Sequence, residues 1–295
     1  MRPDEFADSL YRESPPPTLY HYTSLPGLLG ILRSGTIWAS EARYLNDSAE
    51  LIHAFNLMTH EVRRRLAAAP GADEQEVLRQ FGEWIEIRSA RGPMVFVAAF
   101  TQHGNLLSQW RGYCPPTGGV SFGLASAHLA AACASTNFAL GRCRYVPAEQ
   151  VPLITNLVEV VTAFATRTGP ADKAHPNQSY HPSFALSEEA ILRVAVLMKN
   201  VRFQEEAEWR IVSRAVSDYV GTKISYRTGA SMLVPYLEFS VTNMDRVIPI
   251  DDVIVGPTPH PEAATESVQR CVAQHMQRKH GPLTSQYCSI PYRSW

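Results

Sequence analysis

Charged side chains of both signs alternate in the segment Glu206-Ala207-Glu208-Trp209-Arg210. If this segment opens a strand, Glu206, Glu208 and Arg210 share one face, and Trp209 lies on the other. Two neighbouring carboxylates raise the pKa of one of them, whereas a guanidinium favours ionisation. A carboxylate in this setting could stabilise a developing oxocarbenium cation or bind a ribose hydroxyl. The alternative interpretation is a solvated run of charges at the start of a strand.

A second candidate is His21-Tyr22-Thr23, at the end of a strand expected from Leu19. Alternation along the strand places the imidazole of His21 and the hydroxyl of Thr23 on one face, and Tyr22 on the other. Donor and acceptor groups converging there could hold a ribose diol. A buried, hydrogen-bonded histidine beside a core tyrosine is the plainer alternative.

Aromatic residues and an arginine share a short helix expected near 105–113, where Trp110, Arg111 and Tyr113 follow a strand that ends at Thr101. Such a helix could stack on a flat heterocycle and neutralise a diphosphate. The alternative is a half-buried helix with a surface arginine.

Asn46 and Asp47 are further polar candidates. They equally suit the polar cap of the long helix that follows, because Asp47 or Ser48 could accept its first backbone amides.

Two other chemistries are alternatives to these interpretations. The segment 119–123 matches the Gly-x-Ser-x-Gly pattern of serine hydrolases, which requires a strand before the serine and a helix directly after it. Here Ser121 falls inside an expected strand, so a serine hydrolase is an alternative rather than the leading interpretation. His175 and His181 lack the spacing of a helical metal site, and we expect no metal.

Composition limits the class of protein. The chain has 295 residues and 27 Lys plus Arg against 28 Asp plus Glu, a formal charge of -1 that does not by itself attract a polyanion. Its five cysteines form no Cys-x-x-Cys pair, which argues against a disulfide framework or a zinc knuckle. No stretch suits a membrane span or a secretory signal. We therefore expect a cytoplasmic protein without a membrane partner.

The elements that position these residues are mixed strands and helices without strict β-α-β alternation, which favours an α+β fold. We expect a leader over 1–18, which ends in three prolines, and a single domain over 19–295 with a mobile loop at 169–183. The expected strands are 19–22, 36–40, 94–100, 120–124, 141–146, 208–215, 232–241, 252–255 and 287–292. The expected helices are 25–33, 48–69, 73–87, 105–113, 151–166, 186–200 and 263–279.

A series of short motifs follows in order along the chain from 19 to 293. They are Leu19-Tyr20-His21-Tyr22-Thr23, Ile31-Leu32 with Gly35 and Trp38, Asn46-Asp47 with Glu50, Phe100-Thr101, Trp110 with Tyr113 and Gly119, Lys199 ahead of 206–210, Val253-Ile254-Val255-Gly256-Pro257, and Ser289-Ile290-Pro291-Tyr292-Arg293. Together they resemble a bacterial family, the domain-of-unknown-function family 2971. The chain departs from that pattern at Ser48, where the family usually has proline, and in its longer loop at 169–183.

This family is similar in turn to ADP-ribosyltransferases that use a histidine, an aromatic residue and a glutamate. The resemblance implies a split β-sheet core flanked by helices, with NAD as the substrate in a cleft. In such a site His21 binds the adenine-side ribose, Tyr113 or Trp110 stacks near nicotinamide, and Glu208, or failing that Glu206, holds the nicotinamide-side ribose 2′-hydroxyl. The remaining candidates for contact with NAD are Tyr22, Thr23, Thr101 and Arg210, with Asn46, Asp47 and Arg293 as further polar candidates.

We therefore expect an NAD-cleaving ADP-ribosyltransferase or NAD glycohydrolase, with a toxin or antiphage defence effector as a possible setting. The acceptor of ADP-ribose could be a nucleic acid, a protein or water. Two alternatives stay open: a non-catalytic nucleotide-sensing module, and a serine hydrolase acting through Ser121.

Overall fold

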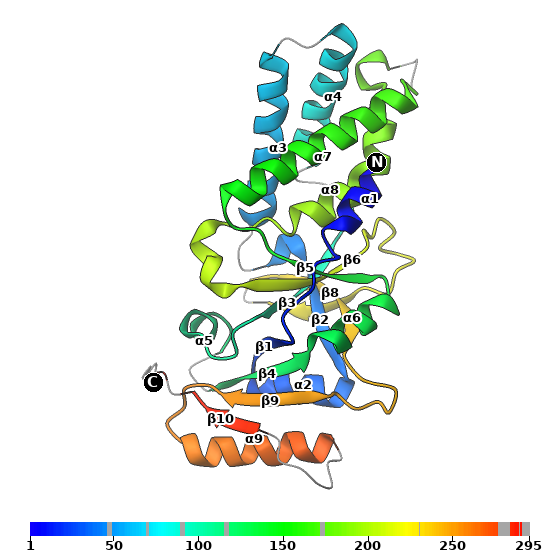
Figure 1. The fold of residues 1–295 in the computed structure, drawn as a ribbon. Coiled ribbons are helices and arrows are strands. Elements are labelled where there is room, and N and C mark those ends of the chain that lie inside the picture. Colours follow the sequence, from blue (N-terminus) through cyan, green and yellow to red (C-terminus); the bar gives the residue numbers. More distant parts are fainter. Residues whose placement is uncertain are drawn as a thin grey trace.

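The computed structural model describes residues 1–45, 49–68, 71–88, 92–114, 118–171, 175–229, 231–276, 284–288 and 290. The candidates Asn46, Asp47 and Arg293 lie outside these residues. A β-sheet occupies the lower half of the view in Figure 1, and a group of helices stands above it. The mixture of helices with a largely antiparallel sheet confirms the α+β class.

The described part of the chain forms one mixed sheet. Its strands are β1 (Thr18–Ser24), β2 (Thr36–Glu41), β3 (Phe96–Thr101), β4 (Gly119–Ala125), β5 (Phe138–Arg142), β6 (Glu208–Ser213), β7 (Ser225–Thr228), β8 (Leu233–Ser240), β9 (Ile250–Val255) and β10 (Thr284–Tyr287). Their order is β10-β9-β4-β1-β3-β2-β8-β7, with β6 on β3 and β5 on β6. The β10–β9 pair is parallel, and the other strand pairs are antiparallel.

The sheet divides where β1 meets β3. β1 pairs with β4 from Thr18 to Ser24, but with β3 only through Tyr20 and Thr101. β3 instead pairs with β6 from Val97 to Thr101. Because the backbones of β1 and β3 separate after one residue pair, their side chains face an opening in the sheet at this point.

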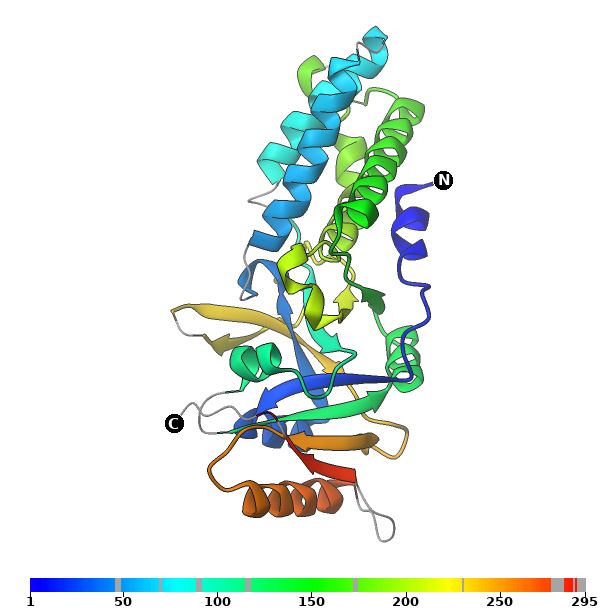
Figure 2. The same ribbon diagram turned by 60° about the vertical axis from the view of Figure 1, so that its left-hand side comes forward.

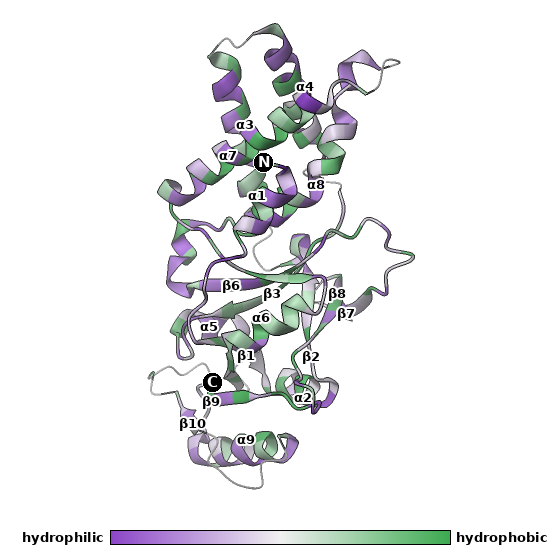
Figure 3. Ribbon diagram, turned by 45° about the vertical axis from the view of Figure 1, so that its right-hand side comes forward, coloured by the Kyte–Doolittle hydropathy of each residue, from purple (hydrophilic) through white to green (hydrophobic). Residues whose placement is uncertain are grey.

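The helices form two groups with separate cores. α2 (Leu25–Ser34), α6 (Ser126–Ala134) and α9 (Pro261–His275) pack on the sheet. α1 (Pro3–Ser9), α3 (Ala49–Ala67), α4 (Ala72–Arg88), α7 (Pro147–Thr168) and α8 (His181–Ala195) make a bundle above it (Figure 2). Hydrophobic and hydrophilic residues alternate along the bundle helices, as expected for amphipathic helices with one buried face (Figure 3).

Three 3₁₀ helices and α5 complete the described elements. The 3₁₀ helices are η1 (Ala42–Tyr44), η2 (Pro176–Gln178) and η3 (Val201–Glu206), and α5 (Leu107–Tyr113) lies beside β1. None of the helices in the described ranges is long and apolar enough to cross a membrane.

Local signals predicted α2 well. The Ser24 side chain accepts a hydrogen bond from the Gly27 amide at 3.1 Å, and Gly35 ends the helix in the left-handed conformation, with φ of 71°. Serine commonly caps the start of a helix, and glycine adopts positive φ without a Cβ clash, so both ends of the expected helix 25–33 carry a local signal.

Several elements differ from the sequence expectation. The expected leader contains α1, which buries Phe6 and joins Asp8 to Arg193 of α8 at 2.5 Å. Within the segment 169–183, η2 and the first turn of α8 are helical. β5 begins at Phe138 rather than 141, because its register on β6 starts with the pair Phe138 and Ser213. α6 and β7 were not predicted, since α6 is alanine-rich and β7 is short and largely exposed.

Candidate functional site

A pocket lies at the opening between β1 and β3. Its walls come from β1, β3, α5 and the start of β6, and its lining residues are Tyr20, His21, Tyr22, Ala99, Phe100, Thr101, Gln109, Tyr113, Glu206 and Glu208. His21, Tyr113 and Glu208 therefore face one cavity although they are far apart in the sequence. Strand pairing brings them together, because Thr101 at the end of β3 pairs with Tyr20 of β1 on one side and with Glu208 of β6 on the other.

Contacts of the imidazole ring hold His21 in place beside the pocket. Nδ1 lies 2.9 Å from the carbonyl oxygen of Ala99, and the ring packs against Phe100 and Phe122. A carbonyl only accepts hydrogen bonds, so Nδ1 carries the proton in the neutral ring and Nε2 is left as an acceptor. Burial lowers the pKa of His21, and the hydrogen bond to Ala99 opposes this shift only in part. The ring is thus held neutral and offers one acceptor to a ligand hydroxyl.

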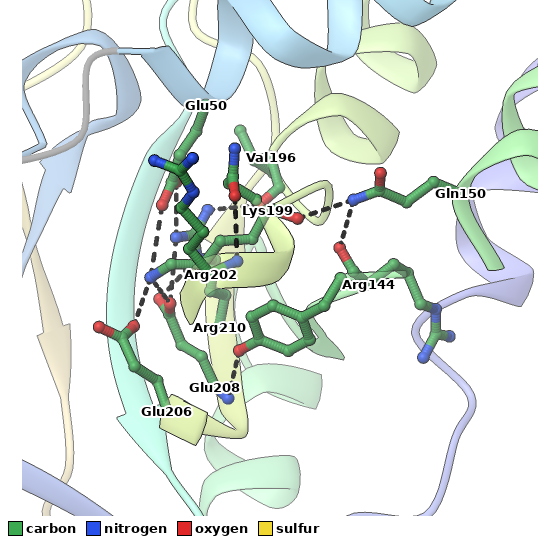
Figure 4. Close-up of polar contacts among 11 residues, drawn as sticks. Glu50, Arg144, Gln150, Val196, Lys199, Arg202, Glu206, Glu208 and Arg210 are labelled. Atoms are coloured by element: carbon green, nitrogen blue, oxygen red, sulfur yellow. Dashed lines mark hydrogen bonds and ion pairs between the residues drawn. The ribbon is translucent and has the colours of Figure 1, made fainter. Parts of the chain in front are cut away.

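Glu208 belongs to a buried ion cluster, which we define as Glu50, Lys199, Glu206, Glu208 and Arg210 (Figure 4). Lys199 Nζ contacts Glu206 Oε2 at 2.5 Å, Glu50 Oε1 at 3.4 Å and Glu208 Oε2. Arg210 pairs with Glu208 Oε1 through Nε at 2.7 Å and with Glu50 Oε2 through Nη2 at 2.6 Å. The cluster lies where the helical bundle meets the sheet, since Glu50 begins α3 and Lys199 follows α8.

The charges of the cluster do not cancel. Three carboxylates face two cations, so the fully ionised cluster carries one negative charge. Glu208 and Arg210 are 4% and 2% exposed, which means that water screens this charge little. Glu206 and Glu208 line the pocket, so the surplus negative charge faces it.

The two pocket carboxyl groups have pKa values shifted in opposite directions. Burial alone would raise the pKa of Glu208, but Arg210 and Lys199 outweigh it and lower that pKa to about 2. Burial raises the pKa of Glu206, and Lys199 only partly offsets it, while the charge of Glu208 adds to it. Glu208 is therefore the permanent carboxylate, and Glu206 is the group better suited to take up a proton.

The backbone around Ala207 sets the positions of both glutamates. Ala207 ends η3 in the left-handed region, with φ of 41°, which is uncommon for a residue with a side chain. Thr101 Oγ1 donates to the Glu206 carbonyl at 2.5 Å, and the Gln102 amide donates to the Ala207 carbonyl at 3.3 Å. The end of β3 thus holds this turn. Thr101 contributes to the site by fixing Glu206 as well as by lining the pocket.

Three residues expected to contact NAD do not line the pocket. Trp110 is 1% exposed, donates its ring N–H to Asn105 Oδ1 at 2.8 Å and packs on Tyr22. Arg210 is buried behind Glu208, and Thr23 lies further along β1 beside Val120 of β4. Of the two aromatic candidates, Tyr113, with 39% exposure, is the one that faces the pocket.

Tyr22 has a mainly structural role. Its hydroxyl donates to the His103 carbonyl and accepts from the Leu106 amide, both at 2.8 Å. It therefore fixes the segment that leads into α5, although part of the residue also borders the pocket.

Ser121 lies in the middle of β4, paired with Tyr22 and Ile254, and is fully buried. The strand continues to Ala125, so no helix follows the serine directly. The elbow that a serine nucleophile requires is not formed here.

Lys199 and Glu50 complete the ion cluster, and neither was predicted to have a role. Both occur in the family motifs, but a lone lysine and a lone glutamate in helical surroundings carry no local signal of pairing. Pairing with Glu208 arises only because α3 and the segment after α8 meet over β6.

The fold and site define an α+β protein in which two carboxylates, ion-paired with Lys199 and Arg210, line a small pocket. Residues 109–211 match the model of a family described as "Protein of unknown function (DUF2971)". This segment contains Tyr113, Lys199, Glu206, Glu208 and Arg210, and it agrees with the resemblance found from the sequence motifs. No curated protein and no solved structure matches the chain.

Proposed function

We propose that this protein cleaves the nicotinamide glycosidic bond of NAD, as an ADP-ribosyltransferase or an NAD glycohydrolase. The observation that carries the proposal is the convergence of His21, Tyr113 and Glu208 on one pocket. The opening between β1 and β3 supports an ADP-ribosyltransferase-like split core, since it exposes strand ends from both halves of the sheet.

The roles follow from charge and hydrogen-bonding capacity. Neutral His21 accepts a hydrogen bond from an adenine-side ribose hydroxyl through Nε2. Tyr113 offers an exposed ring for stacking on nicotinamide. Glu208 accepts a hydrogen bond from the nicotinamide-side ribose 2′-hydroxyl and, being ionised, stabilises the oxocarbenium-like transition state.

The reaction needs one proton acceptor. The bond between ribose C1′ and the ring nitrogen breaks with its electron pair going to the ring, so nicotinamide leaves as a neutral molecule. A water or a macromolecular nucleophile then bonds to C1′ and loses a proton. Glu206, whose pKa burial raises, is the group placed to take up that proton.

The size of the pocket limits how NAD is bound. Its volume is about 40 Å³, which suits one end of a ligand rather than a whole dinucleotide. The reacting ribose and its neighbouring hydroxyls would enter the pocket, and the remainder of NAD would lie over its rim.

The test is release of nicotinamide from NAD labelled in that ring, by purified protein alone, with nucleic acid and with lysate. Glu208→Gln, which keeps the shape and removes the charge, should lower the rate by about 100-fold or more. Glu266→Gln on α9 is the matched control, because Glu266 is exposed and, among the described residues, its ion pair is with Arg270. Absence of both release and NAD binding in all conditions would refute the proposal.

A non-catalytic nucleotide-sensing module is the second candidate. One observation favours it: both oxygens of Glu208 are already bound by Lys199 and Arg210, which leaves less of its charge for a reacting substrate. NAD binding without nicotinamide release, unchanged by Glu208→Gln, would identify this function.

A further inference from the structure

A second cleft lies at the far end of β6 from Glu208. It is formed by the N-terminal segment, α8, and the β5 and β6 strands, which lie next to one another in Figure 1. Its volume is about 370 Å³, within the range of small-molecule sites. Glu208 and Arg214 are six positions apart along an extended strand, so the two clefts are separated by roughly 20 Å.

The lining of this cleft is cationic. Arg12, Arg193 and Arg214 line it together with a single acid, Asp8, which gives three positive charges against one negative. Glu189, which does not line the cleft, pairs with Arg214 at 2.8 Å. When the charge of Glu189 is also counted, a surplus of one positive charge remains. In the part of the chain that the structure describes, the side chain of the exposed Arg12 makes no hydrogen bond or ion pair.

Arg193 is held in place before any ligand arrives. Its side chain is 2% exposed, Nη1 donates to Asp8 Oδ1 at 2.5 Å, and the guanidinium lies 4.4 Å from the centre of the Tyr11 ring. Its Nε is a buried donor for which the described residues supply no acceptor. Buried donors are nearly always paired in folded proteins, so an unpaired one beside a cleft needs a partner other than the described residues.

We propose that this cleft binds the phosphate group of a small ligand, either free phosphate or a phosphate monoester. Guanidinium groups present several N–H donors in a planar fork that matches phosphate oxygens, and fixing the fork in advance lowers the entropy lost on binding. Asp8 orders the site, because it lies between Arg193 at 2.5 Å and Arg214 at 3.6 Å. The proposal does not depend on NAD cleavage.

The test measures binding to the full chain by calorimetry, with inorganic phosphate and adenosine monophosphate as probes and chloride at matched ionic strength as the reference. Arg12→Gln and Arg214→Gln should each weaken binding by roughly tenfold, since each removes a charge-assisted contact. Arg270→Gln on α9 is the matched control, because it removes an equal charge from an exposed pair elsewhere.

The outcomes separate the possibilities. Similar affinities for both probes would indicate that phosphate itself is recognised, whereas binding of adenosine monophosphate alone would indicate a phosphate monoester. No binding of either probe, or equal affinity in the protein and in both cleft variants, would overturn the proposal. Glu208→Gln should bind phosphate normally, so failure at one site is distinguishable from failure at the other.

Discussion

Replacement of Lys199 by methionine is the most direct test of the buried ion cluster. The Lys199 side chain is 5% exposed, and its Nζ contacts carboxylates from Glu50, Glu206 and Glu208. Methionine fills a similar volume but carries no charge. The variant would leave three carboxylates facing Arg210 alone, so we expect a large loss of stability at neutral pH.

The size of the loss can be worked out in two ways. Removing one partner of a buried ion pair costs about 3–5 kcal/mol, because an uncompensated charge remains. The lowered pKa of Glu208, from 4.5 to about 2, corresponds to about 3 kcal/mol, which is the amount by which the attraction of Arg210 and Lys199 exceeds the cost of burial. Since Glu206 is partly exposed and can be rehydrated, we expect a loss near the lower figure, about 3 kcal/mol.

The loss should depend on pH with a definite sign. The folded-state pKa of Glu208 lies below its ordinary value, so its contribution to stability is complete above pH 4.5 and is lost as the pH falls toward about 2. Lys199→Met raises that folded-state pKa. The difference between the variant and the parent protein should therefore be largest near neutral pH and shrink below pH 4.5.

Urea unfolding followed by tryptophan fluorescence measures this difference. Lys199→Met with Glu206→Gln should recover part of the loss, because one carboxylate is then neutral. Arg270→Met, which breaks the exposed pair with Glu266, is the control and should cost under about 1 kcal/mol. A loss for Lys199→Met as small as the control, or one that is equal at neutral and acidic pH, would refute the reasoning.

Four further predictions concern individual residues. Burial lowers the pKa of His21, so NAD affinity should stay constant as the pH falls to 6.5 and decrease only at lower pH, when Nε2 is protonated. Calorimetry measures this affinity, and an affinity that increases on acidification would contradict the prediction. Tyr113→Ala should weaken NAD binding by about tenfold with little change in melting temperature. Trp110→Phe should lower the melting temperature by a few degrees and leave affinity unchanged, and the reverse pattern would exchange their roles. A fluorophosphonate probe should not label Ser121, because it is buried within β4; labelling would restore the hydrolase alternative.

The parts of the fold that depend on residues close together in the sequence were predictable. Alternation along a strand correctly placed Glu208 and Arg210 on one face, and the helix expected over 25–33 matches α2 to within one residue. The same local rules missed α6, which has too little apolar periodicity, and the start of β5, whose register is set by pairing with β6.

Trp110 shows the limit of composition as a guide to sites. An aromatic residue beside an arginine suits both a stacking surface and a core position, and the sequence left these open. Packing against Tyr22 and the hydrogen bond to Asn105 bury Trp110, while Tyr113, one turn further along α5, reaches the pocket.

The sequence by itself determined which side chains share a face within β1 and β6, because the direction of a side chain along a strand follows from backbone geometry alone. Only the tertiary structure decided that His21, Tyr113 and Glu208 meet, because the early separation of β1 from β3 depends on strands paired across the whole chain. It also decided the ionisation of the site. Lys199 and Glu50 reach Glu208 from the helical bundle, and the resulting burial and ion pairing set pKa values that no local pattern encodes.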